Sequence, residues 1–112
     1  MTNKDLEKAL ALKALTSIDA ENEVEGCYVG DLLSWVMGRA NEKEAWITVM
    51  GNVNAVAVAK LVDISCIILC EDAHLDDEAK QRAEENGIPI YSSGETAYRL
   101  AVRAGKLLGE IE

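Results

Sequence analysis

Two uninterrupted apolar runs, Ala45–Met50 and Cys66–Cys70, dominate the pattern of hydrophobic and polar positions along the chain. Continuous apolarity with several β-branched residues is typical of strands that are buried on both faces of a sheet. The segment between the runs, Gly51–Ser65, has the length of the crossover of about a dozen residues that joins parallel strands. We therefore expect a helix over Asn54–Val62, although its alternating valines and alanines would also suit a strand.

Weaker hydrophobic signals add strands on both sides of this central unit. Val24–Gly30 and Ile88–Tyr91 are short apolar segments next to turn residues, and each is expected to form a strand. Leu12–Ile18 is expected to be a short extended piece, followed by an acidic turn over Asp19–Glu23. From Val24 onward, the spacing leaves room for a helix after each strand.

Polar residues that can accept from free backbone N–H groups indicate where the helices begin. The four candidate caps are Thr2, Asp31, Asp76 and Ser92. The first and the last are followed three residues later by an acid, Asp5 and Glu95, which is the spacing of a capping box. We expect the helices after the second and third caps to stop at Gly38 and Gly87, and the last helix to end near Leu108.

The alternation of strands and helices predicts one α/β domain over residues 1–112, with a mostly parallel sheet and helices packed on it. A chain of 112 residues is the usual size of a single domain, and no linker or repeat divides it. The last helix is expected to face the sheet with an apolar stripe formed by Ala97, Ala101, Ala104 and Leu108.

The net negative charge of the chain argues against two classes of partner, nucleic acids and anionic membranes. There are 11 Lys and Arg against 20 Asp and Glu, which gives a formal charge of −9 at pH 7. This sign repels nucleic-acid phosphates and anionic membrane surfaces, so we expect neither as a partner. No apolar run approaches the roughly 18 residues of a membrane span, and the charged segment Met1–Lys8 lacks the apolar region of a signal peptide. With an odd number of cysteines, we expect a cytoplasmic protein with reduced thiols.

The cysteines and the histidine raise the question of a metal or redox site. On a strand, Cys66 and Cys70 lie about 13 Å apart, too far to share a zinc ion or a disulfide, so we interpret them as small buried hydrophobic residues. His74 follows Cys70, Glu71 and Asp72, which could form a crowded loop metal site. A solvated histidine beside carboxylates is the interpretation we prefer, and we predict no metal and no cofactor.

Polar residues after the predicted strands mark a candidate ligand site. Parallel α/β sheets bind ligands outside the carboxyl ends of their strands, where free helix N–H groups gather. The candidate residues are Gly51, Asn52, Asn54, Cys70, Ser92 and Ser93. They could bind a nucleotide or a small anion, or the asparagines and serines could act only as helix caps, and both interpretations remain open.

A short, strongly apolar helix is the candidate surface for a partner. It carries Leu32, Leu33, Trp35, Val36 and Met37, so apolar residues lie nearly all round it. Only part of such a helix can face the core of its own domain, which predicts that the rest covers a second copy of the chain. The other tryptophan lies in the predicted strand Ala45–Met50 and is expected to be buried.

Most of the chain, from about Val24 to Leu108, resembles the DRTGG domain family, in particular its small stand-alone members. The resemblance rests on the stretches Gly26–Gly38, Ala45–Met50, Asn52–Ala59 and Glu85–Ser93. It implies an α/β fold related to the N-terminal domain of HPr kinase/phosphorylase, a tendency to form homodimers, and a regulatory or ligand-sensing role. Stand-alone members of this kind are often encoded near iron-only hydrogenases.

The chain departs from the motif that names the family. Asn52-Val53-Asn54 stands where the family has Asp-Arg-Thr, and Cys70-Glu71-Asp72 stands where it has Thr-Gly-Gly. Losing the arginine removes a bidentate phosphate donor, and the two acids place negative charge where an anion would bind. Phosphoryl transfer lacks its machinery as well, because the only Gly-Lys pair, Gly105-Lys106, is not part of a phosphate-binding loop.

These observations predict a non-catalytic regulatory or ligand-sensing domain that acts as a homodimer. An alternative from another class is a protein–protein adaptor or accessory subunit that uses the acidic surface and the Trp35 helix. Such a subunit could be associated with a hydrogenase, and it would bind no small molecule. A third hypothesis is a small enzyme or redox sensor acting through Cys70, which requires a thiol of depressed pKa.

Overall fold

A computed structural model describes all 112 residues, and it contains one sheet with strand order β1-β5-β4-β3-β2. Strands β2, β3, β4 and β5 are parallel to one another, and β1 pairs antiparallel with β5. The strands are β1 (Lys13–Ala14), β2 (Gly26–Val29), β3 (Glu44–Thr48), β4 (Cys66–Leu69) and β5 (Ile90–Ser92). The helices are α1 (Asn3–Ala9), α2 (Leu33–Arg39), α3 (Val53–Val62), α4 (Asp77–Asn86) and α5 (Ala97–Leu107).

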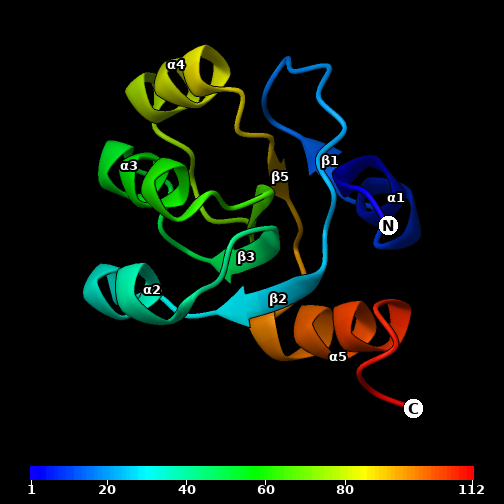
Figure 1. Cartoon of the computed structure of the whole chain (residues 1–112). Coiled ribbons are helices and arrows are strands. Elements are labelled where there is room, and N and C mark those ends of the chain that lie inside the picture. Colours follow the sequence, from blue (N-terminus) through cyan, green and yellow to red (C-terminus); the bar gives the residue numbers. More distant parts are fainter.

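The sheet lies between two layers of helices (Figure 1). Helices α2, α3 and α4 cover one face, and α1 and α5 cover the other. The crossovers β2-α2-β3, β3-α3-β4 and β4-α4-β5 place their three helices on the same face, and α5 follows the last parallel strand onto the other face. The prediction of an α/β domain with a mostly parallel sheet is therefore confirmed, and so is the helix in the central crossover. No helix has the combination of length and apolarity that crossing a membrane requires.

Alternate side chains of the strands point to opposite faces of the sheet and belong to two separate hydrophobic cores. Trp46 pairs in register with Ile67 on the next strand, and this row packs under α2, α3 and α4. Ile47 pairs with Ile68, and this row packs under α1 and α5. Because both faces are covered, Ala45–Thr48 and Cys66–Cys70 are buried without interruption, whereas Val49 and Met50 at the end of the first run are not buried.

Asp31 does not cap α2, contrary to prediction. The N-cap position is occupied by Leu32, which has no side-chain cap. The carboxylate of Asp31 instead accepts from the hydroxyl of Thr48 at 2.7 Å and from the N–H of Val49 at 3.0 Å. The buried hydroxyl of Thr48, at the end of β3, thus binds the carboxylate that the sequence pattern predicted to cap the helix. Helix α2 also runs through Gly38 and ends at Arg39.

The predicted capping box of the last helix is wrong as well. Ser92 belongs to β5, and the cap of α5 is Thr96, whose hydroxyl accepts from the N–H of Arg99 at 3.3 Å. The helix therefore starts later, and Leu100 becomes its fully buried anchor, a residue absent from the predicted stripe. At α4, Asp76 occupies the N-cap position without a side-chain hydrogen bond.

The N-terminal helix is held to the sheet by a buried asparagine. Asn3 accepts from the N–H of Asn22 at 2.6 Å, and its amide donates to the carbonyl of Ala20 and the hydroxyl of Tyr91, both at 3.0 Å. The predicted capping box of Thr2 with Asp5 is confirmed. Asn3 thereby fixes the loop before β2, which matters for the site described below.

Candidate functional site

The six predicted ligand-binding residues all lie at the carboxyl edge of the sheet. Gly51 and Asn52 follow β3, Cys70 follows β4, and Ser92 and Ser93 end β5 and begin the next loop. Asn54 is exposed in the first turn of α3. The topology thus brings the predicted residues to one edge, but none of them lines any of the four hollows on the surface.

The loops after β3 and β4 are pressed against each other. A Cβ atom added to Gly51 would lie 2.0 Å from the carbonyl oxygen of His74, so no larger residue fits there without moving backbone. The carbonyl of Gly51 also accepts from the N–H of Asp76 at 2.8 Å. Glycine at this position therefore serves a close approach of two loops.

The backbone donors after β4 are already used within the protein. Glu71 donates to the carbonyl of Glu95, and Asp72 donates to that of Ser93, both at 2.9 Å. Ala73 donates to the carbonyl of Cys70 at 3.0 Å. These three N–H groups are therefore unavailable to an anion, although Glu71 and Asp72 have positive φ angles of 55° and 56°, the conformation that the glycines of the resembled motif favour.

Two of the predicted side chains at this edge already accept hydrogen bonds from the protein. Asn52 accepts from the N–H of Ala55 at 2.9 Å, and the hydroxyl of Ser93 accepts from the N–H of Glu95 at 3.1 Å. Arg103 forms an ion pair with Glu95, so its guanidinium group is not free to bind an anion. Open backbone N–H groups remain at the starts of the helices that follow the strands, on Val53 and Asn54 of α3, on Asp77 and Glu78 of α4, and at the starts of α2 and α5.

Cys70 does not have the properties of a reactive thiol. It is 1% exposed, and its sulfur lies 3.7 Å from the carbonyl oxygen of Thr48. Burial raises its pKa, and the neighbouring carboxylates of Glu71 and Asp31 raise it further. A redox or nucleophilic role needs a depressed pKa, so the burial of the thiol and the raised direction of its pKa argue against the third hypothesis.

The metal interpretation finds no geometry to support it. No three His, Cys, Asp or Glu side chains in the chain lie close enough together to hold a metal ion. His74 is largely exposed, and its Nε2 atom lies 3.7 Å from a carboxylate oxygen of Asp76.

Apolar side chains are exposed on α2 and on the segments next to it, at the end of β2 and after β3. We call this group the α2 patch and define it as Val29, Leu32, Trp35 and Val49, which are 45%, 59%, 52% and 41% exposed. The guanidinium of Arg39 stacks over the Trp35 ring at 3.6 Å. The patch borders β2, an edge strand whose outward backbone groups have no strand partner. Val36 of the same helix is fully buried, and Trp46 is fully buried as predicted.

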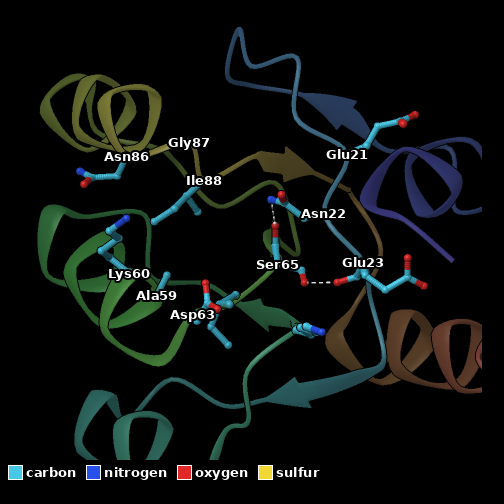
Figure 2. A pocket seen from close by; sticks show the side chains of 12 residues that line it. Glu21, Asn22, Glu23, Ala59, Lys60, Asp63, Ser65, Asn86, Gly87 and Ile88 are labelled. Atoms are coloured by element: carbon cyan, nitrogen blue, oxygen red, sulfur yellow. Dashed lines mark hydrogen bonds between the residues drawn. The ribbon is translucent and has the colours of Figure 1, made fainter.

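The largest hollow lies at the opposite, amino edge of the sheet, and sequence reasoning missed it. Figure 2 shows this hollow, of about 400 Å³, between the ends of α3 and α4 and the loop that precedes β2. Its wall contains Asn22, Lys60, Asp63, Ser65 and Asn86. In the sequence, its residues appear only as charged and polar residues in turns between helices and strands. Such residues ordinarily belong to solvated loops.

Comparison with solved structures identifies a fold related to this one. The crystal structure of the CBS and DRTGG domains of the regulatory region of Clostridium perfringens pyrophosphatase, complexed with the activator diadenosine tetraphosphate, matches with a TM-score of 0.72. The match covers 98% of this chain at 11% identity, and this chain spans 47%, about half, of that one. No protein-family model and no curated protein sequence matches the chain. At this identity the likeness shows the fold alone, so the DRTGG resemblance has support at the level of the fold.

Proposed function

We propose that the chain is a non-catalytic regulatory or ligand-sensing domain that acts as a homodimer. The observation that carries the proposal is the α2 patch, which combines four exposed apolar side chains with the free edge of β2. Isologous contact of two such patches would bury the tryptophan of each copy, and buried tryptophans contribute strongly to interfaces.

The fold supports a regulatory rather than a catalytic role. Its structural neighbour is a regulatory region of an enzyme, crystallised with an activator. The present chain has no phosphate-binding loop, no cluster of metal-ligating side chains and no thiol of depressed pKa. Function must be argued from a site, and the exposed features of this chain are those of binding.

Sedimentation of a concentration series tests the homodimer. Trp35→Ala should raise the dissociation constant of the dimer at least tenfold, which corresponds to about 1.4 kcal/mol. Tyr98→Ala is the matched control, because Tyr98 is an aromatic residue that is 77% exposed on α5, outside the patch. A wild-type chain that stays monomeric at every concentration, or an equal effect of Tyr98→Ala, would contradict the proposal.

The salt dependence of the dimer provides a second check. Each copy carries a formal charge of −9, so two copies repel each other at low ionic strength. Contact through apolar side chains should therefore tighten as added salt screens the repulsion. Contact through ion pairs would weaken under the same conditions.

A ligand at the carboxyl edge remains part of the proposal. A nucleotide or small anion there would use the open N–H groups of Val53 and Asn54, next to the side chains of Asn52 and Ser92 and the other predicted residues. Thermal-shift measurements with nucleotides and inorganic phosphate test it, and Asn54→Asp should abolish any stabilisation. The used donors and the acids Glu71 and Asp72 lead us to expect weak binding at best.

The alternative function is that of an adaptor or accessory subunit, and the same α2 patch favours it if the patch binds another protein. The two functions differ in what covers Trp35. Native mass spectrometry of the protein purified from its own cells should give a homodimer under the first function. A stoichiometric complex with a different chain, lost on Trp35→Ala, would favour the second.

A further inference from the structure

The hollow at the amino edge is built from segments that are distant in sequence, with Lys43 at its edge. The C-terminal ends of α3 and α4 form one side, and the loop before β2 forms the facing side (Figure 2). Its apolar floor is formed by the buried residues Ala59, Ile64 and Ile88. At about 400 Å³, the hollow has the size of sites that take small metabolites.

Hydrogen bonds fix the facing wall and leave an acceptor open. The amide nitrogen of Asn22 donates to the carbonyl of Ser65 at 2.9 Å, and the hydroxyl of Ser65 donates to the carbonyl of Glu23. The side-chain oxygen of Asn22 receives no hydrogen bond from the protein. Asn86 is in the same state, since its amide donates to the carbonyl of Arg82 at 2.8 Å and its side-chain oxygen has no donor.

Charges of both signs line the hollow without partners. Lys43, Lys60, Asp63 and Glu21 take part in none of the ion pairs of the chain, whereas Glu23 pairs with the terminal ammonium group at 2.8 Å. Figure 2 shows the carboxylates of Glu21 and Glu23 pointing away from the hollow, with Lys60 and Asp63 on the opposite side. One carboxylate and one ammonium group of α3 are thus placed at the rim, three residues apart.

The ends of the two helices add negative potential to the same place. Asp63 and Gly87 are the C-caps of α3 and α4, with φ angles of 65° and 69°. The last carbonyls of a helix carry a partial negative charge that stabilises cations. An ammonium group would therefore be favoured next to Asp63, between the two helix ends.

We propose that this hollow binds a small zwitterion, specifically a free α-amino acid. Its ammonium group contacts Asp63 and the side-chain oxygen of Asn22, its carboxylate contacts Lys60 with Lys43 nearby, and its side chain lies on the apolar floor. The inference goes beyond the proposed function, because it places a ligand at the amino edge and not at the carboxyl edge, and it does not depend on the homodimer. A bound amino acid would connect α3 and α4 to the loop before β2, so binding could change how these segments are positioned.

Ligands with a single charge fit this hollow less well. An anion would meet Asp63, two helix C-termini and the −9 charge of the chain. A cation would leave Lys60 without a counter-charge and close to a second positive group. A dipolar ligand satisfies both unpaired groups at once, since each pairing is charge-assisted.

Calorimetric titration of the full-length chain with the twenty free amino acids tests the proposal. Each amino acid that binds is compared with its N-acetyl derivative, which lacks the ammonium group, and its amide, which lacks the carboxylate. We expect at least one free amino acid to bind and both derivatives to bind at least tenfold more weakly. The proposal is overturned if no free amino acid binds, or if either derivative binds as tightly as its parent.

Two variants locate the binding. Asp63→Asn keeps a residue that tolerates the left-handed conformation, and Lys60→Met keeps the length of an exposed side chain, so both should fold. Each should lower affinity at least tenfold. Asp77→Asn and Lys80→Met, which make the same changes on α4 outside the hollow, should leave affinity unchanged. Equal losses in the two pairs would place the binding elsewhere, whatever the result for the homodimer.

Discussion

The two edges of the sheet differ in how completely they are filled. At the carboxyl edge, the loops after β3, β4 and β5 are hydrogen-bonded to one another, and Gly51 touches the backbone of His74. At the amino edge, the ends of α3 and α4 stand apart from the loop before β2 and leave a hollow of about 400 Å³. At the carboxyl edge the N–H groups of Glu71, Asp72 and Ala73 are bonded within the protein. At the amino edge, Lys60 and Asp63 have no ion-pair partner.

This difference shows how topology and chemistry can point to different places. The rule that parallel sheets bind ligands beyond the carboxyl ends of their strands follows from where helix N-termini converge. It presumes loops with free N–H groups, which the glycines of a motif such as Thr-Gly-Gly would provide. Here Glu71 and Asp72 keep a glycine-like conformation but direct their N–H groups to the next loop.

The close contact at the carboxyl edge should be the most sensitive to substitution. Gly51→Ala places a methyl group 2.0 Å from the carbonyl oxygen of His74, and relief requires movement of backbone. We expect it to lower the free energy of unfolding by about 3 kcal/mol, measured by urea denaturation. Gly38→Ala is the control, since a Cβ there meets nothing within 4 Å and should stabilise α2 by about 0.5 kcal/mol. Equal effects of the two variants would contradict a tight carboxyl edge.

The facing wall of the hollow should depend on Asn3. Asn3→Ala removes the acceptor of the Asn22 N–H and leaves that group and the hydroxyl of Tyr91 without this partner. We expect a loss of about 2 kcal/mol in the free energy of unfolding, because buried polar groups lose their hydrogen bonds. Hydrogen exchange should show faster exchange at Asn22. Unchanged exchange there would show that the loop is held by other contacts.

The link between the β2 and β3 loops should be weaker but measurable. Thr48→Val removes the hydroxyl that donates to Asp31 and accepts from the N–H of Met50 at 3.2 Å, with little change in volume. We expect a loss of about 1.5 kcal/mol in a thermal or urea transition. Asp31→Asn, which keeps an acceptor oxygen for the same donors, should cost less. A larger loss from Asp31→Asn would mean that its charge, and not the hydrogen bonds, matters.

A buried thiol at the amino end of β4 should make stability fall at alkaline pH. Burial raises the pKa of Cys66 from 9.0 to about 12. The unfolded chain loses this proton near pH 9 while the folded chain keeps it, so the contribution is complete below pH 9 and is lost as pH rises toward 12. At pH 10 the loss should be about 1.4 kcal/mol.

The matched variant for this pH effect is Cys66→Ala, compared with wild type at pH 8 and pH 10. The variant is less stable at both values, yet its stability should decrease less between them. Parallel decreases would show that other groups, such as the partly buried thiol of Cys27, account for the alkaline transition.

The rim of the hollow should be the most tolerant of change in the absence of ligand. Lys60→Met and Asp63→Asn alter exposed side chains without partners in the chain, so each should change the free energy of unfolding by less than about 0.5 kcal/mol. Thermal denaturation checks this expectation. A large loss would mean that these groups stabilise the fold, which would remove them as free ligand-binding groups.

Much of the fold was predictable because the strongest signals are local and periodic. The runs around Trp46 and Ile67 read as buried strands, and the crossover length between them required a helix. The errors occurred where a polar side chain had a tertiary partner. The local sequence around Asp31 favours a helix cap, but its carboxylate is hydrogen-bonded to Thr48 on a neighbouring strand.

The candidate site was less predictable for a related reason. The positions of Asn52 and Ser93 at the carboxyl edge follow from topology, and both lie there. Whether their groups are free depends on loop–loop hydrogen bonds that no spacing encodes. The hollow at the opposite edge joins Asn22, Lys60 and Asn86, residues that only the fold brings together.

The choice between the two edges is tested most directly by mapping amide chemical shifts of the labelled protein during titration with the free amino acid that binds most tightly. We expect the largest shifts at Asp63, Ser65 and Gly87, around the hollow, with Asn54 and Ser93 unchanged. Largest shifts at Asn54 and Ser93 would place the ligand at the carboxyl edge and contradict the account.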